Sequence, residues 1–159
     1  MITGKIKISK KLISKVKRLP FRHVPHKHFP KSWTKYPKNS LKHLEYGSKT
    51  KNHPWFNNFK PTNAINVGYL FTKLESGHVV PPHKDHFKNF AKYYNVTLGK
   101  IKRRLVFIED WKPGHFFQVN NRVFTNWLSG DFIEWKKKDM HLGGNFGLDP
   151  RYVLQITYY

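Results

Sequence analysis

The chain has no cysteine, few acidic residues and no long apolar run. Without thiols it can form neither a disulfide nor a thiolate metal site, which fits a reducing compartment. No stretch approaches the roughly 20 apolar residues that cross a bilayer, and the first residues lack the apolar segment of a signal peptide. We therefore expect a cytoplasmic protein without a transmembrane segment. Its 159 residues are enough for one domain with a real core.

The scarcity of acids leaves a large positive charge. There are 9 Asp and Glu against 30 Lys and Arg, a formal charge of +21. Residues 1–60 hold 16 basic residues and one acid, Glu45, which gives +15, while residues 61–159 hold 14 against 8, which gives +6. This basic segment can be a solvated surface, or it can anchor nucleic acid or another polyanion, because clustered Lys and Arg release counterions on binding phosphate. The sequence leaves both interpretations open.

Residues 1–60 are expected to form a basic N-terminal extension, containing helix and irregular segments, that packs on or beside a core of residues 61–159. Apolar residues near helical spacing predict a helix within the first 20 residues, which Ser9 can cap and Pro20 can end. We expect it to pack its apolar side on the domain, although such a helix can also lie on a membrane or on nucleic acid. Repeated prolines after it argue against long regular elements.

From residue 62 onward the composition is typical of strands. β-Branched and aromatic segments separated by turn residues predict strands over 64–74, 101–109, 115–119, 122–128, 132–135 and 151–159, a short helix over 87–94 and a glycine-rich loop over 143–145. Six to eight short strands of this kind are typical of a β-sandwich or jelly roll. We therefore predict a mainly β fold.

A His-x-Asp triplet, His83-Lys84-Asp85, is followed much later by His141 and Arg151. In an extended segment residues i and i+2 point to the same side, so His83 and Asp85 can reach one ion. Two imidazoles and one carboxylate on one face of a metal form the facial triad of non-haem Fe(II) oxygenases. The planar guanidinium of Arg151, at the start of a strand, can hold the far carboxylate of a dicarboxylic cosubstrate.

These residues and the motifs between them resemble the Fe(II)/2-oxoglutarate-dependent oxygenases, above all the small virus-encoded members of the prolyl-hydroxylase-like branch. The matching motifs, over about residues 64–159, are His83-x-Asp85, Arg104-Leu105-Val106-Phe107, Asp110-Trp111-x-Pro113-Gly114, Trp127-x-x-Gly130-Asp131, His141, Asn145 and Arg151-Tyr152-x-Leu154. The resemblance implies a double-stranded β-helix, a cupin-like jelly roll, with Fe(II) and 2-oxoglutarate in the barrel mouth. It does not extend to residues 1–60.

By this resemblance His83, Asp85 and His141 are the iron ligands and catalytic residues, and His115 competes with His141. Arg151 pairs with the distal carboxylate of 2-oxoglutarate. Further candidates to hydrogen-bond 2-oxoglutarate are Tyr69, Gln155 and Thr157, because strand alternation can place the last two on the same face as Arg151.

Two departures from the family pattern limit what the resemblance implies about the substrate. Prolyl hydroxylases usually hold the distal carboxylate with lysine, whereas this chain has Arg151. Nucleic-acid demethylases of the same superfamily place a second arginine where this chain has Thr157. A prolyl substrate is therefore not implied, and a nucleic-acid substrate is less expected.

The sequence thus predicts an oxygenase that uses Fe(II), 2-oxoglutarate and O2 to hydroxylate a C–H bond of a protein or peptide side chain or of a small metabolite, releasing succinate and CO2. One alternative is the same chemistry on nucleic acid gripped by residues 1–60. Another is a metal-free jelly-roll binding module. We expect a monomer, and the abundance of Lys, Asn, Ile and Phe fits an AT-rich viral genome and hence the host cytoplasm.

Overall fold

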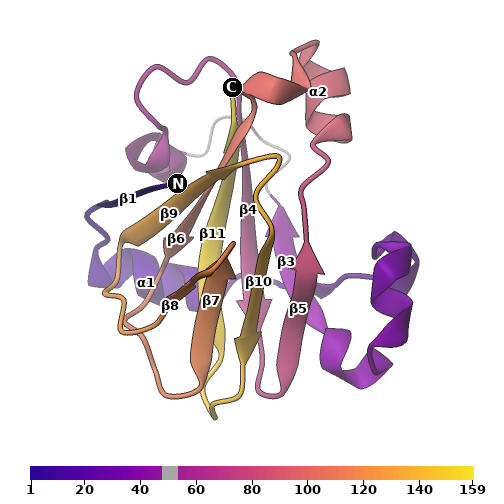
Figure 1. Ribbon diagram of the computed structural model, residues 1–159. Coiled ribbons are helices and arrows are strands. Elements are labelled where there is room, and N and C mark those ends of the chain that lie inside the picture. The colour runs from indigo at the N-terminus through magenta and orange to yellow at the C-terminus, as the bar shows by residue number, and fades with distance from the viewer. Residues whose placement is uncertain (48–53) are drawn as a thin grey trace.

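Two antiparallel sheets dominate the computed structural model, which describes residues 1–47 and 54–159 (Figure 1). The strands are β1 (Ile2–Lys5), β2 (Arg22–His23), β3 (His43–Gly47), β4 (Val67–Leu74), β5 (His78–His83), β6 (Lys102–Phe107), β7 (His115–Val119), β8 (Arg122–Phe124), β9 (Asp131–Lys136), β10 (His141–Asn145) and β11 (Arg151–Tyr158). The helices are α1 (Lys10–Lys17) and α2 (Lys88–Tyr94), and the 3-10 turns are η1 (His26–His28), η2 (Lys31–Lys35), η3 (Lys38–Leu41), η4 (Pro54–Phe59) and η5 (Leu98–Lys100).

The large sheet has the strand order β1-β9-β6-β11-β4-β3-β2, and the small sheet has the order β5-β10-β7-β8. Strands far apart in sequence are neighbours in both: β11 lies between β4 and β6, and β10 lies between β5 and β7. This is the arrangement of a jelly roll, so the prediction of a mainly β, jelly-roll fold is confirmed. Among the described residues, no helix is long and apolar enough to cross a membrane.

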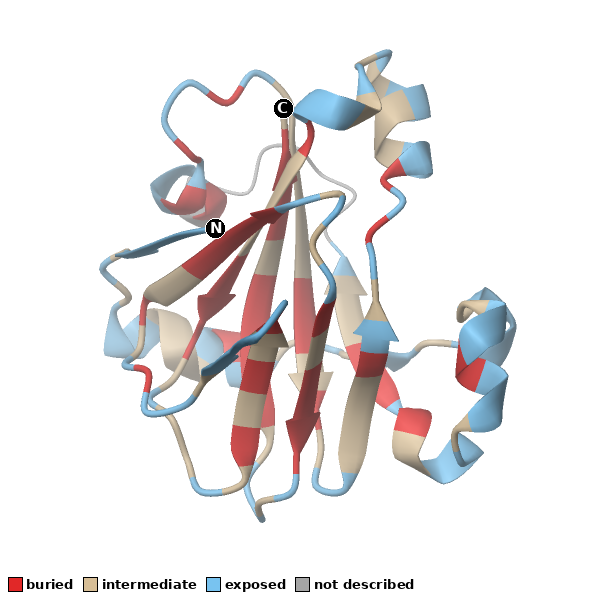
Figure 2. Ribbon diagram, viewed as in Figure 1, coloured by how far each residue is buried: buried red, intermediate tan, exposed pale blue. Residues whose placement is uncertain are grey.

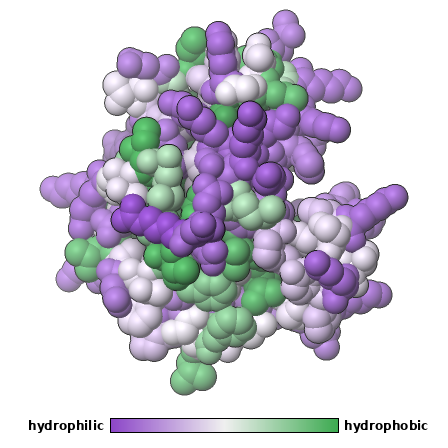
Figure 3. All heavy atoms as spheres, viewed as in Figure 1, coloured by the Kyte–Doolittle hydropathy of each residue, from purple (hydrophilic) through white to green (hydrophobic). Residues whose placement is uncertain are grey.

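Alternation along β11 divides the core into two layers. Leu154 and Ile156 are fully buried on the outer side of the large sheet, where α1 and η4 cover it, and Val153 packs between the two sheets with Phe117 and Trp135. Along β11 every residue except Gln155 is buried, and in Figure 2 the strands of the two sheets carry mixed bands of buried and intermediate residues. On the face seen in Figure 3, hydrophobic side chains gather in the lower middle, and hydrophilic ones lie above them and toward both sides.

Helix α1 forms for the reasons that the sequence offers. The side chain of Ser9 accepts a hydrogen bond from the backbone N–H of Leu12 at 3.2 Å, which satisfies one of the unpaired donors of the first turn. The helix ends at Lys17, just before Pro20. Val16 is fully buried against the outer face of the large sheet and Leu12 packs beside it, so the helix packs its apolar side on the domain as predicted.

Residues 1–47 do more than pack beside the core, because they contribute strands to the large sheet. Strand β1 pairs with β9, and β2 and β3 continue the large sheet beyond β4. Turns η1 to η3, the purple coils beside β5 in Figure 1, connect β2 to β3. Residues 1–47 therefore supply three strands of the sheet whose other strands come from residues 61–159.

The loop predicted over residues 143–145 is wrong, because these residues form most of β10. Glycines at 143 and 144 suggested a turn, but β10 pairs with β5 on one side and β7 on the other. A Cβ at Gly144 would lie 2.4 Å from the ring of Phe116, so a side chain would not fit there. The glycines provide room for neighbouring side chains within the sheet, and the backbone pairing on both sides outweighs their weak strand preference.

Candidate metal centre

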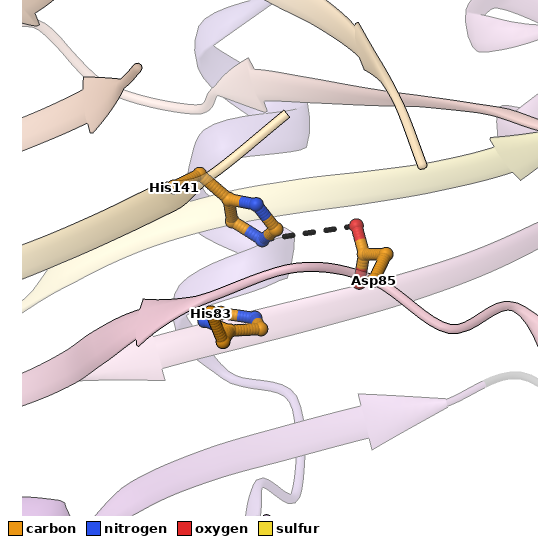
Figure 4. Close-up of side chains that lie close together, drawn as sticks. All are labelled: His83, Asp85 and His141. Carbon is orange, nitrogen blue, oxygen red and sulfur yellow. Dashed lines mark ion pairs between the residues drawn. The ribbon is translucent and has the colours of Figure 1, made fainter. Parts of the chain in front are cut away.

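His83, Asp85 and His141 converge at one end of the small sheet. His83 is the last residue of β5, His141 is the first of β10, and the two lie opposite each other in the ladder between these strands. Asp85 follows two residues after His83 in the chain leaving β5. One ligand atom from each of the three side chains lies within 4.8 Å of the others, and Figure 4 shows them turned toward one point.

The hydrogen bonds of the two histidines leave the same ring nitrogen free in each. Nδ1 of His83 lies 2.8 Å from the carbonyl oxygen of Pro81, and Nδ1 of His141 lies 3.3 Å from that of Asp139. A carbonyl only accepts, so Nδ1 carries the proton and Nε2 presents its lone pair, as a metal ligand must. Burial lowers the pKa of both imidazoles, and that of His141 falls to about 3, so both are neutral at pH 7.

Two donors hold the carboxylate of Asp85. The indole Nε1–H of Trp135 donates to Oδ2 at 3.0 Å, and Nη1 of Arg103 lies 3.2 Å from Oδ1. Nε2 of His141 is 3.7 Å from Oδ2 (dashed in Figure 4). Two neutral imidazoles and an oriented carboxylate, with no thiolate, form a donor set that suits Fe(II) in a facial arrangement. The residues present therefore fit a non-haem iron ion.

A cavity of about 310 Å³ adjoins the two histidines. The two sheets form most of its wall, and residues from β2 to β3 complete it. The residues that line it are Val24, His28, Phe29, Pro30, Trp33, His43, Glu45, Leu70, Thr72, Val80, His83, Arg103, Leu105, Phe117, Trp135, His141, Arg151, Val153 and Gln155. Its size is at the lower end for a small-molecule site.

Arg151 brings a buried positive charge to this cavity. It is 5% exposed, its Nη1 donates a hydrogen bond to the carbonyl oxygen of Phe116, and its Nε has no partner among the described residues. No carboxylate of the described residues pairs with it, and burial lowers its pKa to about 10, so it stays protonated at neutral pH. A buried cation without a counter-ion is costly. The arrangement therefore favours an anionic ligand.

The other predicted cosubstrate contacts fall in three different places. Gln155 lines the cavity, where Nη1 of Arg103 donates to its Oε1 at 2.6 Å. Thr157 borders a separate shallow pocket beside α2. Tyr69 lies on the opposite face of the large sheet and stacks on Phe56, with ring centroids 4.4 Å apart. Gln155 thus lines the same cavity as Arg151, whereas Tyr69 and Thr157 do not.

His115, the competitor for the third ligand position, is engaged elsewhere. Its Nε2 lies 2.8 Å from the carbonyl oxygen of Asp149, and its ring lies 6.4 Å from that of Trp127. The cluster that could hold a metal among the described residues contains His141 instead.

Sequence reasoning missed three parts of the site. The sequence analysis gives Trp135 and Arg103 no part in it, yet both hold Asp85. The sequence analysis also gives no site role to Trp33, which lines the cavity. Arg103 and Trp135 lie opposite each other in the ladder between β6 and β9. The sequence does not show that they share a site, because it does not reveal that these two strands pair.

The comparisons with known proteins identify the fold. No family model and no curated protein matches the sequence. Among solved structures, a Pseudomonas putida prolyl-4-hydroxylase is similar over 99% of this chain and 91% of that one, with a TM-score of 0.68 and 7% identity. A predicted oxalate decarboxylase from Thermotoga maritima is similar over 90% and 95%, with a TM-score of 0.52 and 12% identity. The chain is thus a jelly roll whose fold resembles that of a prolyl-4-hydroxylase.

Proposed function

We propose that this protein is an Fe(II)- and 2-oxoglutarate-dependent dioxygenase that hydroxylates a C–H bond. The observation that carries the proposal is a His-Asp-His cluster whose two histidines share one cavity with Arg151, a buried arginine without a carboxylate partner among the described residues. The prolyl-4-hydroxylase fold neighbour is consistent with it. A binding module without a metal would have no need of two neutral histidines beside a held carboxylate.

His83, Asp85 and His141 would hold the iron. Bound there, Fe(II) with 2-oxoglutarate and O2 supplies the oxidising chemistry and yields succinate and CO2, while the protein supplies geometry and electrostatics. The Nδ1 protons of the two histidines stay on backbone carbonyls and fix the ring orientation. Trp135 and Arg103 fix the carboxylate of Asp85, so the triad is pre-organised before the metal binds.

Arg151 would bind the distal carboxylate of 2-oxoglutarate. Its guanidinium reaches past Gly143, where a Cβ would lie only 3.0 Å from Nη1, so the glycine preserves the space that the guanidinium needs. A carboxylate there would satisfy the free Nε–H and neutralise the buried charge. Arg151 is a stronger anchor than lysine because its planar fork can donate two parallel hydrogen bonds.

The size of the cavity limits what reacts. About 310 Å³ must hold the cosubstrate and the reacting group of the substrate together. We infer that a side chain of a protein or peptide, or a small metabolite, enters next to His83, where the ring of Trp33 meets the imidazole edge-on at a centroid distance of 5.2 Å.

The test is 2-oxoglutarate turnover by the purified protein with Fe(II) in air, with succinate measured as the product. We expect slow turnover without substrate in the wild type, none in His83→Ala, and wild-type turnover in His86→Ala, a matched control. His86 is exposed and lies directly after Asp85. Equal turnover in all three proteins, or iron retained in full by His83→Ala, would show that the triad is not the metal site.

A further inference from the structure

A groove leads from the cavity across the N-terminal segment. The cavity shares Val24, His28, Glu45 and Leu70 with a second hollow of about 490 Å³. That hollow in turn shares residues beside β2 with a third, of about 340 Å³, which reaches Lys42. The three hollows form one path along β2 and η1. A chain lying in this path can place one side chain in the cavity.

The segment that borders the groove is strongly basic, and two of its cations, Arg22 and Lys42, line the groove itself. No acidic residue occurs between Arg22 and Leu44, and the exposed cations of this stretch are Arg22, Lys27, Lys31, Lys35, Lys38 and Lys42. None of them forms an ion pair with another described residue. Glu45 borders the groove, but its Oε1 is held by Nε2 of His43 at 3.2 Å. The surface therefore attracts a ligand that carries negative charges.

An open strand edge borders the same groove. Strand β2 pairs with β3 alone in the described part of the chain, and it ends the large sheet. The N–H of Val24 donates to the carbonyl oxygen of His43 at 3.2 Å, so that residue faces β3. In an antiparallel ladder the groups alternate, so the N–H and C=O of His23 point away from β3. An extended peptide can pair its backbone with such an edge, and a nucleic acid cannot.

The groove lacks the feature on which single-stranded nucleic acid relies. Proteins that bind it stack bases on exposed aromatic rings. None of the exposed large hydrophobic residues of the described chain lies within residues 21–47. Trp33 is 4% exposed and packs against Phe29 and His83. Charge and backbone edge together favour a peptide.

We propose that the substrate is an acidic protein segment, bound extended along β2, with its backbone paired to His23, its carboxylates beside Arg22 and Lys42, and one side chain inserted toward His83. This rests on the proposed hydroxylase function and names its substrate class. The N-terminal segment is then the substrate-recognition part of the domain.

The probe for the test is a fluorescein-labelled 12-residue peptide of alternating Glu and Thr, with the Gln/Thr peptide and a 12-nucleotide oligo-dT as comparisons. Anisotropy titrations use the full chain at physiological salt. We expect the Glu/Thr peptide to bind more tightly than either comparison ligand. The double variant Arg22→Gln/Lys42→Gln should weaken binding of the Glu/Thr peptide roughly tenfold, because it removes two solvent-exposed ion pairs. The control Lys10→Gln/Lys11→Gln removes the same charge from exposed positions of α1 and should change binding less than about twofold.

A second probe, the Glu/Thr peptide N-methylated at alternate residues, has the same charge but cannot pair with a strand edge on its methylated side. We expect it to bind more weakly. Equal weakening by both double variants, equal binding of the methylated peptide, or tighter binding of oligo-dT would each overturn the proposal. These outcomes are independent of iron, because binding is measured without metal. If the wild-type chain turns over 2-oxoglutarate but does not bind the Glu/Thr peptide, the substrate class is rejected and the hydroxylase function still stands.

Discussion

Replacing Arg151 by methionine should stabilise the protein in the absence of cosubstrate and abolish cosubstrate binding. Burial lowers the pKa of Arg151 from 12.5 to about 10, a difference that corresponds to about 3 kcal/mol against the charged form. Methionine fills a similar volume without the charge. The variant loses the hydrogen bond to the carbonyl of Phe116, which costs about 1 kcal/mol. We therefore expect a net gain of about 2 kcal/mol in the free energy of unfolding.

Urea unfolding of the metal-free protein measures this gain, and thermal unfolding with and without 2-oxoglutarate measures binding. 2-Oxoglutarate should raise the melting temperature of the wild type and leave that of Arg151→Met unchanged. The control is Arg122→Met, at an exposed position of β8, which should alter stability by less than about 0.5 kcal/mol and leave binding intact. A folded Arg151→Met that is less stable than the wild type would refute the reasoning, because the guanidinium would then be well satisfied without an anion.

Three further predictions follow from the same geometry. Trp135→Phe removes the donor to Oδ2 of Asp85 and should weaken Fe(II) binding by about 10-fold to 100-fold in an anaerobic titration; unchanged affinity would contradict a positioning role. Burial lowers the pKa of His141 to about 3, whereas in the unfolded chain this histidine has its ordinary pKa of about 6.5. Below that pH the unfolded chain therefore binds more protons than the folded one. Stability should thus fall with decreasing pH, by about 2 kcal/mol between pH 7 and 5, and a flat urea-unfolding profile would count against a neutral buried His141. Gly143→Ala places a Cβ 3.0 Å from Nη1 of Arg151 and should weaken 2-oxoglutarate binding roughly tenfold by calorimetry while iron binding persists; equal loss of both would indicate general misfolding.

The candidate triad could be predicted from sequence because its chemistry is local or strongly patterned. His83 and Asp85 are two residues apart in an extended segment, so one side of the chain carries both. Arg151 opens the segment over 151–159 that indicates a strand, and strand ends are where jelly rolls bring distant residues together. The structure brings His83, Asp85 and His141 together, and the two histidines line one cavity with Arg151.

The rest of the site depends on pairings that one sequence does not reveal. Asp85 and Trp135 are 50 residues apart, and nothing in either local pattern indicates that the indole N–H reaches the carboxylate. Gly143 and Gly144 indicated a loop, because glycine is common in loops. In the structure they leave space for the side chains of Arg151 and Phe116, which belong to other strands, and the local sequence does not reveal this role. Tyr69 is on a strand with the expected alternation, but alternation does not say which face looks into the cavity.

The basic segment was the hardest part to predict. Its prolines correctly indicated short elements, and η1 to η3 are 3-10 turns that each follow a proline. Its strands, however, are only two to five residues long, and β1 and β2 have exposed side chains. They are held by the edges of a sheet built from the rest of the chain, so their own residues carry little strand signal.

The most direct test of the central claim is an anaerobic titration with Fe(II) followed by 2-oxoglutarate, monitored for the weak visible charge-transfer band of a chelated keto acid. The account predicts that the band appears with the wild type and with His86→Ala, and that it is absent from Asp85→Ala. A folded wild-type protein that binds no iron, or gives no band, would contradict the account and leave a basic jelly roll with a different ligand.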